Sequence, residues 1–202
     1  MKIRHSELEA CRKDPAGWLA SSGGFARGGY ASDIKLAISH FHKSGSHASA
    51  QGKLEEYLKK RVNAQKKQWA RDTLDNYVVA FGSGDWLVAD TKLRLSLELG
   101  SGVVMSGEMS RIDVSAKSGQ YQAVLLSASI DGNWKSELRW PLVQLAVSQK
   151  YSREIEEIAV GIQTLDGSTI DTRCFSKGKI DKCVTEAAGL AETINSLSSK
   201  YK

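Results

Sequence analysis

The middle of the chain reads Val103-Val104-Met105-Ser106-Gly107-Glu108-Met109-Ser110-Arg111-Ile112-Asp113-Val114, in which apolar, often β-branched residues occur in short runs. A polar break follows at residues 116–120, and a second apolar run occupies residues 121–127. Upstream, an apolar segment at residues 87–89 leads into residues 93–99, where apolar and polar side chains alternate. Runs of this kind, separated by short polar breaks, are typical of strands joined by hairpins. The sequence therefore predicts an antiparallel unit of three strands.

Length and composition are those of one globular domain. The chain has 202 residues, of which 41% are hydrophobic and 25% are charged, as is usual for a chain that builds its own core. We expect a single domain over residues 1–202, with a mainly helical, basic region at 1–80 and a sheet core with flanking helices at 81–202. No run is long and apolar enough for a membrane helix, and the first residues lack the apolar core of a signal peptide. We therefore expect a cytoplasmic protein without membrane contact.

Positive charge is concentrated in the N-terminal third. Residues 1–76 hold 14 Lys and Arg against 8 Asp and Glu, a net charge of +6, whereas residues 77–202 hold 14 against 15, a net charge of −1. Within this third, residues 53–77 predict one long helix with Leu54, Leu58, Val62 and Trp69 on its apolar stripe. Basic residues occupy a sector of roughly 140° on its other side. The sector contains Lys59, Lys60, Lys66, Lys67 and Arg71, and Arg61 from the same run completes the candidate cluster. Such a face is the electrostatic footprint of phosphate contacts, and an ordinary solvated helix face is the alternative.

Local patterns predict the remaining elements. Residues 6–11 predict a helix with Ser6 as its N-cap and Glu9 completing a capping box. The glycine-rich segment 21–30 predicts a connector, because no Lys-Ser or Lys-Thr pair follows it as in a phosphate-binding loop. Three further helices and two strands are expected, at residues 33–43, 137–148 and 180–197, and at residues 155–164 and 169–175. His40, His42 and His47 lack a carboxylate or cysteine at ligand spacing, so we expect packed or solvated histidines.

The central segment resembles the nuclease core of the RecB-type branch of the PD-(D/E)XK superfamily. In that family, a strand ending in Gly-x-x-Asp-Arg-[Ile/Val]-Asp is followed by a strand carrying Asp-x-Lys. The first pattern is similar to Gly107–Asp113, with Ser110 at the metal-binding aspartate. The second pattern falls on residues 123–127, with Leu125 at the acidic position and Ser127 at the lysine. The resemblance implies an α/β (α+β) fold with a central mixed β-sheet flanked by helices, a restriction-endonuclease-like core and an N-terminal helical region.

Some members of this family also hold a four-cysteine iron–sulfur cluster. Cys174 and Cys183 are the candidates for it, with Cys11 as a distant partner, but Lys177 stands where another cysteine would be needed. An odd number of cysteines without an export signal instead indicates reduced, unrelated thiols.

The substituted positions lead to three hypotheses about function. Metal-dependent cleavage needs carboxylates for Mg²⁺ or Mn²⁺ and commonly a lysine, so the first hypothesis is an inactive nuclease-fold protein that requires no cofactor. It would bind DNA through the basic helix or scaffold a partner, such as a helicase, in a bacterial DNA-processing or phage-defence system. The second is an active nuclease whose ligands have moved to Glu108, Lys135 and Glu137. The third is a protein-interaction subunit that docks through an apolar face around Leu125.

Overall fold

A computed structural model describes residues 1–21, 28–82 and 84–200, and residues 22–27 of the predicted glycine-rich connector lie outside this range. The described residues form a mixed α/β structure around a six-stranded sheet. The mixed sheet with flanking helices predicted from the sequence is thus confirmed. No helix of the described part is long and apolar enough to cross a membrane.

The predicted three-strand unit forms the centre of the sheet. Its strands are β2 (Trp86–Gly100), β3 (Val103–Ser115) and β4 (Tyr121–Ser127), and all of their mutual pairing is antiparallel. β5 (Ile158–Thr164) adds parallel to β4, and β6 (Ile170–Arg173) adds antiparallel to β5. β2 lies along one side of β3 over nearly its whole length.

The other side of β3 is shared by two strands. A short N-terminal strand, β1 (Lys2–Arg4), pairs in parallel with residues 104–106, whereas β4 pairs only with residues 111–114. The sequence analysis missed β1, because three residues are too few to show a periodic pattern. Between these two partners Gly107 lets His5 approach, since a Cβ atom built on Gly107 would lie 1.9 Å from His5 Cδ2.

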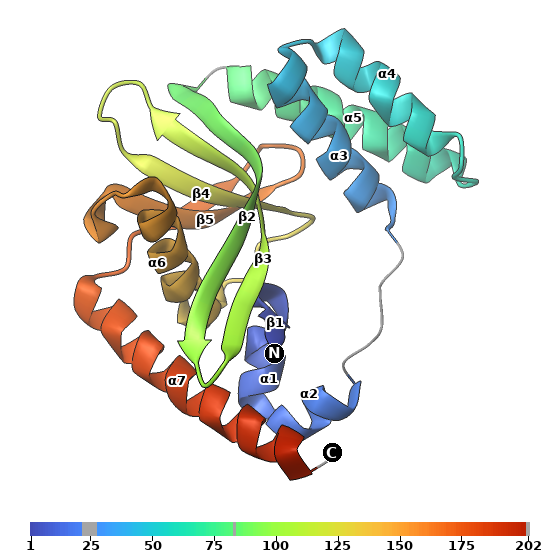
Figure 1. The fold of residues 1–202 in the computed structure, drawn as a ribbon. Helices are drawn as coiled ribbons and strands as arrows, with labels where there is room; N and C mark the ends of the chain where they lie inside the picture. Colours follow the sequence, from blue (N-terminus) through green and yellow to red (C-terminus); the bar gives the residue numbers. More distant parts are fainter. Residues whose placement is uncertain (22–27, 83, 201–202) are drawn as a thin grey trace.

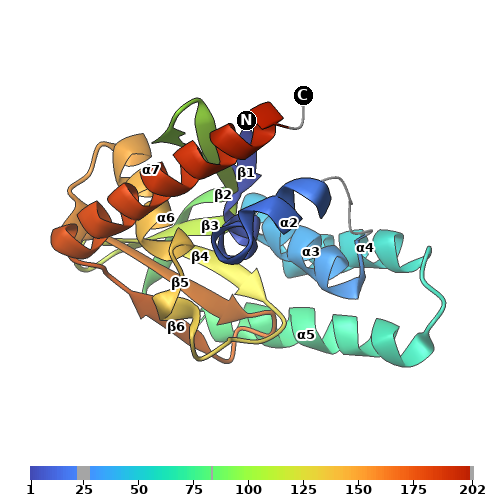
Figure 2. The same cartoon turned by 90° about the horizontal axis from the view of Figure 1, so that it is seen from below.

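Two hydrophobic cores lie on opposite faces of the sheet. The larger core joins the sheet to α1 (Leu8–Lys13), α6 (Arg139–Tyr151) and the long α7 (Lys177–Lys200), and α2 (Pro15–Ser21) packs beside it. The smaller core lies within α3 (Tyr30–Ser44), α4 (His47–Leu58) and α5 (Ala64–Gly82). The alternation of side chains along β4 explains the division, because Ala123 and Leu125 face the larger core and Leu126 faces the smaller one. Figures 1 and 2 show the three helices α3 to α5 on the side away from α7.

The prediction of one helix over residues 53–77 is wrong. The chain forms two helices, α4 and α5, joined by a turn at residues 59–63. Asn63 caps the start of α5, because its side-chain Oδ1 accepts a hydrogen bond from the Lys66 amide at 2.8 Å, as an N-cap residue does. Val62, expected on the apolar stripe, is 97% exposed, and Trp69 is 43% exposed rather than packed on the core.

The other predicted elements agree in type with the structure, with shifted ends. Helix α1 begins at Leu8 without a side-chain cap, so the predicted Ser6 capping box is wrong. In the preceding turn, the Glu7 carboxylate accepts a hydrogen bond from the Arg4 amide at 3.4 Å. Pro141 lies in the first turn of α6, where its missing amide N–H costs no helical hydrogen bond. Gln144 of this helix is fully buried and binds the backbone of Ile155 and Phe175, which fixes α6 to the segments on either side of β5 and β6.

Candidate functional site

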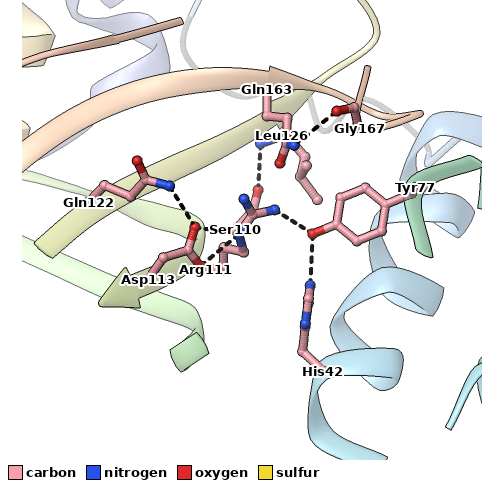
Figure 3. A network of polar contacts seen from close by, with 9 residues as sticks. All are labelled: His42, Tyr77, Ser110, Arg111, Asp113, Gln122, Leu126, Gln163 and Gly167. Carbon is pink, nitrogen blue, oxygen red and sulfur yellow. Dashed lines mark hydrogen bonds and ion pairs between the residues drawn. The ribbon is translucent and has the colours of Figure 1, made fainter. Parts of the chain in front are cut away.

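A buried polar network connects β3 and β4 to α3 and α5 (Figure 3). The guanidinium of Arg111 forms an ion pair with Asp113, with Nε 2.7 and 2.8 Å from the two carboxylate oxygens. Gln122 on β4 donates to the same carboxylate at 3.0 Å. Arg111 also donates through Nη1 to the hydroxyl of Tyr77 on α5, and that hydroxyl lies 2.7 Å from His42 Nε2 on α3. Five side chains from four elements thus form one continuous chain of polar contacts.

Aromatic rings enclose the cationic part of this network. The Arg111 guanidinium carbon lies 5.7 Å from the Tyr77 ring centre and 5.2 Å from the Phe81 ring centre. The His42 ring meets both aromatic rings edge to face, while Tyr77 and Phe81 stack. A cation held against aromatic faces in a desolvated place is stabilised beyond its ion pair. Arg111 and Asp113 are 2% and 0% exposed.

Burial determines the protonation states of the network. Burial and, to a smaller extent, the nearby Arg111 cation together lower the pKa of His42 to about 3. Burial also raises the pKa of Tyr77 and the pKa of Asp113, although Arg111 and Gln122 oppose the shift at Asp113. The Tyr77 hydroxyl accepts a hydrogen bond from Arg111 and donates one to Nε2 of the neutral His42. The network therefore consists of one ion pair, Arg111 with Asp113, whose charges cancel, and of uncharged side chains that are hydrogen-bonded to it.

A pocket of about 330 Å³ opens beside the network. Arg111, Gln122 and Gln163 contribute polar side chains from the sheet, and Phe81 and Trp86 contribute aromatic ones. The side-chain amide of Gln163 donates to the Gly167 carbonyl at 3.3 Å, whereas its Oε1 is buried without a hydrogen-bond partner among the described residues. The pocket wall therefore carries polar groups whose hydrogen-bonding capacity is incompletely used.

The positions that the resemblance aligned with catalytic residues serve the fold here. The Ser110 hydroxyl accepts a hydrogen bond from the Leu126 amide at 2.9 Å. It thus takes the place of the backbone carbonyl that would bind this amide if the pairing of β3 and β4 continued beyond Arg111 and Val124. Leu125 is half-buried and packs on the larger core. Ser127 ends β4, and its carbonyl accepts the Leu165 amide at 2.9 Å.

The proposed relocated ligands occupy separate settings. Glu108 is exposed on β3 and lies across from Arg94 of β2. Lys135 forms an ion pair with Asp171 at 2.7 Å, and Glu137 binds Arg139 and the Trp140 indole. Among the described residues, no three His, Cys, Asp or Glu side chains converge as metal ligands would. Cys11 and Cys183 are buried and Cys174 is half-buried, and burial raises the pKa of each of the three thiols.

The predicted basic cluster divides into two groups. Arg61 and Arg71 are held in ion pairs, Arg61 by Asp33 at 2.7 Å and Arg71 by Glu55 at 2.6 Å. The other four residues, which we call the basic tip, surround the turn between α4 and α5 and form no ion pair within the described part of the chain. The basic tip consists of Lys59, Lys60, Lys66 and Lys67. This turn projects away from the sheet (Figure 1), and the exposed Trp69 ring lies one turn of helix beyond Lys66.

Sequence reasoning singled out Arg111 and Asp113 as part of a pattern but missed their partners. Gln122 and Gln163 each interrupt an apolar strand run, and a polar residue at a buried strand position is the signal that could have found them. His42 and Tyr77 gave no such signal, because their contact spans 35 residues and depends on how α3 packs against α5.

Comparisons with known proteins leave the family open. No protein-family model matches the chain, and no curated protein matches it. Among solved structures, a similar chain is that of the "Crystal structure of SSO0001", which shares 14% sequence identity with a TM-score of 0.32. That match covers 90% of this chain and 85% of the other. A similarity of this degree assigns no activity to the chain.

Proposed function

We propose that this chain is a non-catalytic nucleic-acid-binding protein that contacts the phosphate backbone through the basic tip. The observation that carries the proposal is the difference between the two groups of cations. Arg61 and Arg71 already have carboxylate partners, whereas the four lysines of the basic tip are available on one projecting turn. Closely spaced lysines that form no ion pair can release the counterions condensed on a nucleic acid when they contact its phosphates.

The exposed Trp69 ring next to these lysines favours a single strand. Unpaired bases stack on exposed aromatic rings, and a duplex offers no such face except at its ends. Trp69 is 43% exposed although it is among the largest apolar side chains, and it lies on α5 just after Lys66 and Lys67.

We further propose that the sheet descends from a RecB-type nuclease frame and has lost its chemistry. The order of three antiparallel strands, a helix and a strand parallel to the third supports this origin. Ser110 and Leu125 cannot replace carboxylate ligands of a divalent cation, and Lys135 and Glu137 are already engaged in ion pairs. A role in a multi-component DNA-processing or phage-defence system is compatible with such a protein and belongs to the same proposal.

The test measures binding and cleavage together. Labelled single- and double-stranded DNA is incubated with the protein in Mg²⁺, in Mn²⁺ and in chelator at matched ionic strength, and both retardation and cleavage are recorded. The variant replaces the four lysines of the basic tip by Gln. The matched control removes the same charge elsewhere, by replacing four exposed lysines that also form no ion pair among the described residues. These are Lys2, Lys13, Lys179 and Lys182.

We expect retardation of single strands without cleavage. For a single strand, log Kd changes with log salt by about 0.7 per neutralised phosphate, so loss of the basic tip should reduce the slope by about 3. The control should retain the wild-type slope. Metal-dependent cleavage would instead establish an active nuclease, and an equal loss of slope in variant and control would show that only net charge matters.

A further inference from the structure

We propose that the pocket between α5 and the sheet receives one unstacked nucleobase of a bound single strand. This inference rests on the proposed function and names the part of the ligand that the basic tip does not recognise. The pocket measures about 330 Å³, at the lower end of the range for small-ligand sites, which is about 300 to 1,000 Å³. It therefore suits a compact planar group rather than a large cofactor.

The pocket wall holds hydrogen-bonding groups in fixed positions. Gln163 lines the pocket and is 6% exposed, and its Oε1 is buried without a partner among the described residues. A ligand N–H that enters the pocket and displaces the side chain slightly would supply the missing partner. Arg111 donates through Nε to Asp113 and through Nη1 to Tyr77, and its Nη2 has no hydrogen-bond partner in the described part of the chain. Gln122 uses its amide nitrogen on Asp113, which leaves its carbonyl oxygen as a second acceptor.

Electrostatics exclude a simple anion as the preferred ligand. The charge of Arg111 is offset by Asp113 at 2.7 Å, both being buried, so the pocket presents hydrogen-bonding edges rather than a net positive charge. A buried carbonyl oxygen left without a partner is costly, and a ligand N–H that satisfies it recovers that cost. The ligand must therefore carry both a donor and an acceptor on a neutral frame.

The aromatic side chains of the pocket add the requirement of planarity. Phe81 and Trp86 are half-buried and line the pocket with Ala80 and Ile170. A flat heterocycle can stack on such rings while its edge meets the glutamine and arginine groups. A nucleobase combines these properties, since each base has two flat faces and an edge with donors and acceptors.

The geometry of α5 connects the pocket to the basic tip. Lys66 and Ala80 are separated by 14 residues of one helix, or about 21 Å, which corresponds to about six nucleotides of a stacked strand. Trp69 and Ala80 lie within about 20° of each other around the helix axis. A strand held at the basic tip can therefore follow one side of α5 to the pocket.

Photocrosslinking tests the proposal directly. A 12-nucleotide single strand with one 5-iodouracil per molecule, at varied positions, is irradiated with the protein, and adducts are mapped by mass spectrometry. We expect adducts on Trp86 or Phe81 when the modified base lies about six nucleotides from the segment that contacts the basic tip. Gln163→Met removes the acceptor at nearly constant size and should weaken binding about tenfold, within the range for one base contact.

Controls separate this inference from the proposed function. Gln149→Met, on the exposed surface of α6, should leave affinity unchanged, and Gln163→Met should retain the wild-type salt slope. Adducts on Trp69 alone, with equal affinity of Gln163→Met and wild type, would refute the base pocket and leave the proposed function standing. Failure to retard any oligonucleotide would refute both. Equal affinity for thymidine and for the oligonucleotide would assign the pocket to free nucleosides and overturn the proposal.

Discussion

His42 is predicted to make the fold sensitive to acid. In the folded chain its pKa is lowered from 6.5 to about 3, mainly by burial and also by Arg111. The unfolded chain therefore binds one proton more than the folded chain between these two pKa values, and stability must fall as the pH decreases through that window. The contribution of His42 is fully present above pH 6.5 and is lost progressively between about pH 6.5 and 3.

The size of the effect follows from the same two values. One proton corresponds to about 1.4 kcal/mol per pH unit within the window, so acidification from pH 6.5 to 4.5 should remove about 2 kcal/mol of unfolding free energy through His42. His42→Gln retains a hydrogen-bonding side chain opposite Tyr77 but cannot titrate. The unfolding free energy of the variant relative to that of the wild type should therefore rise by about 2 kcal/mol between pH 6.5 and pH 4.5.

Urea unfolding at pH 7.5, 6.0 and 4.5, followed by circular dichroism, measures this difference. His5 and Asp113, whose pKa values are also shifted by burial, contribute to both proteins and cancel in the comparison. His40→Gln is the matched control, because His40 lies on the same helix and binds Ser49 near the surface. A His42 ring resonance that titrates near pH 6.5, or equal pH dependence of wild type and His42→Gln, would refute the neutral histidine link.

Three further substitutions test how β3 is packed. Gly107→Ala should cost about 1 to 3 kcal/mol of unfolding free energy, because its Cβ would meet the His5 ring; His5→Ala in the same chain should restore most of it, as a double-mutant cycle in urea would record. Ser110→Ala should lower the unfolding free energy by about 1 to 3 kcal/mol, because it leaves the Leu126 amide on β4 without its acceptor. Hydrogen exchange of that amide should accelerate, and an unchanged exchange rate would contradict this role of Ser110. Arg111→Met should cost about 3 to 5 kcal/mol, and a further Asp113→Leu change should recover most of the loss in thermal unfolding; no recovery would show that the charge left on Asp113 is not the cause.

Local periodicity predicted the centre of the fold well. Alternation of side chains defined β2, and short apolar runs separated by turns defined β3 and β4 within a few residues. The same kind of pattern failed at residues 53–77, where Leu54 and Leu58 continued into Val62 and Trp69 as if on one helix. The chain turns at residues 59–63 instead, and Asn63 caps the start of the second helix, a local signal that the periodic pattern does not contain.

The candidate site was less accessible to sequence reasoning than the fold. Partners in the polar network are 34 and 35 residues apart where α3, α5 and β3 meet, so no local window contains them. The availability of the basic tip was equally hidden. Charge counting placed Arg61 and Arg71 with the lysines, and only the folded chain shows that Asp33 and Glu55 neutralise them.

The polar network also has a consequence for binding. Tyr77 lies on α5 and accepts a hydrogen bond from Arg111 on β3. The network therefore fixes the helix that begins within the basic tip and borders the pocket at its other end. Buried ion pairs contribute little net stability compared with well-packed apolar residues, but they fix a single arrangement because alternatives leave a charge unpaired. A strand that must meet two features about 21 Å apart binds more tightly when their separation is set in advance, since less ordering is needed on binding. On the proposed function, the substituted nuclease frame would thus use Arg111 and Asp113 to position α5 rather than to support a metal.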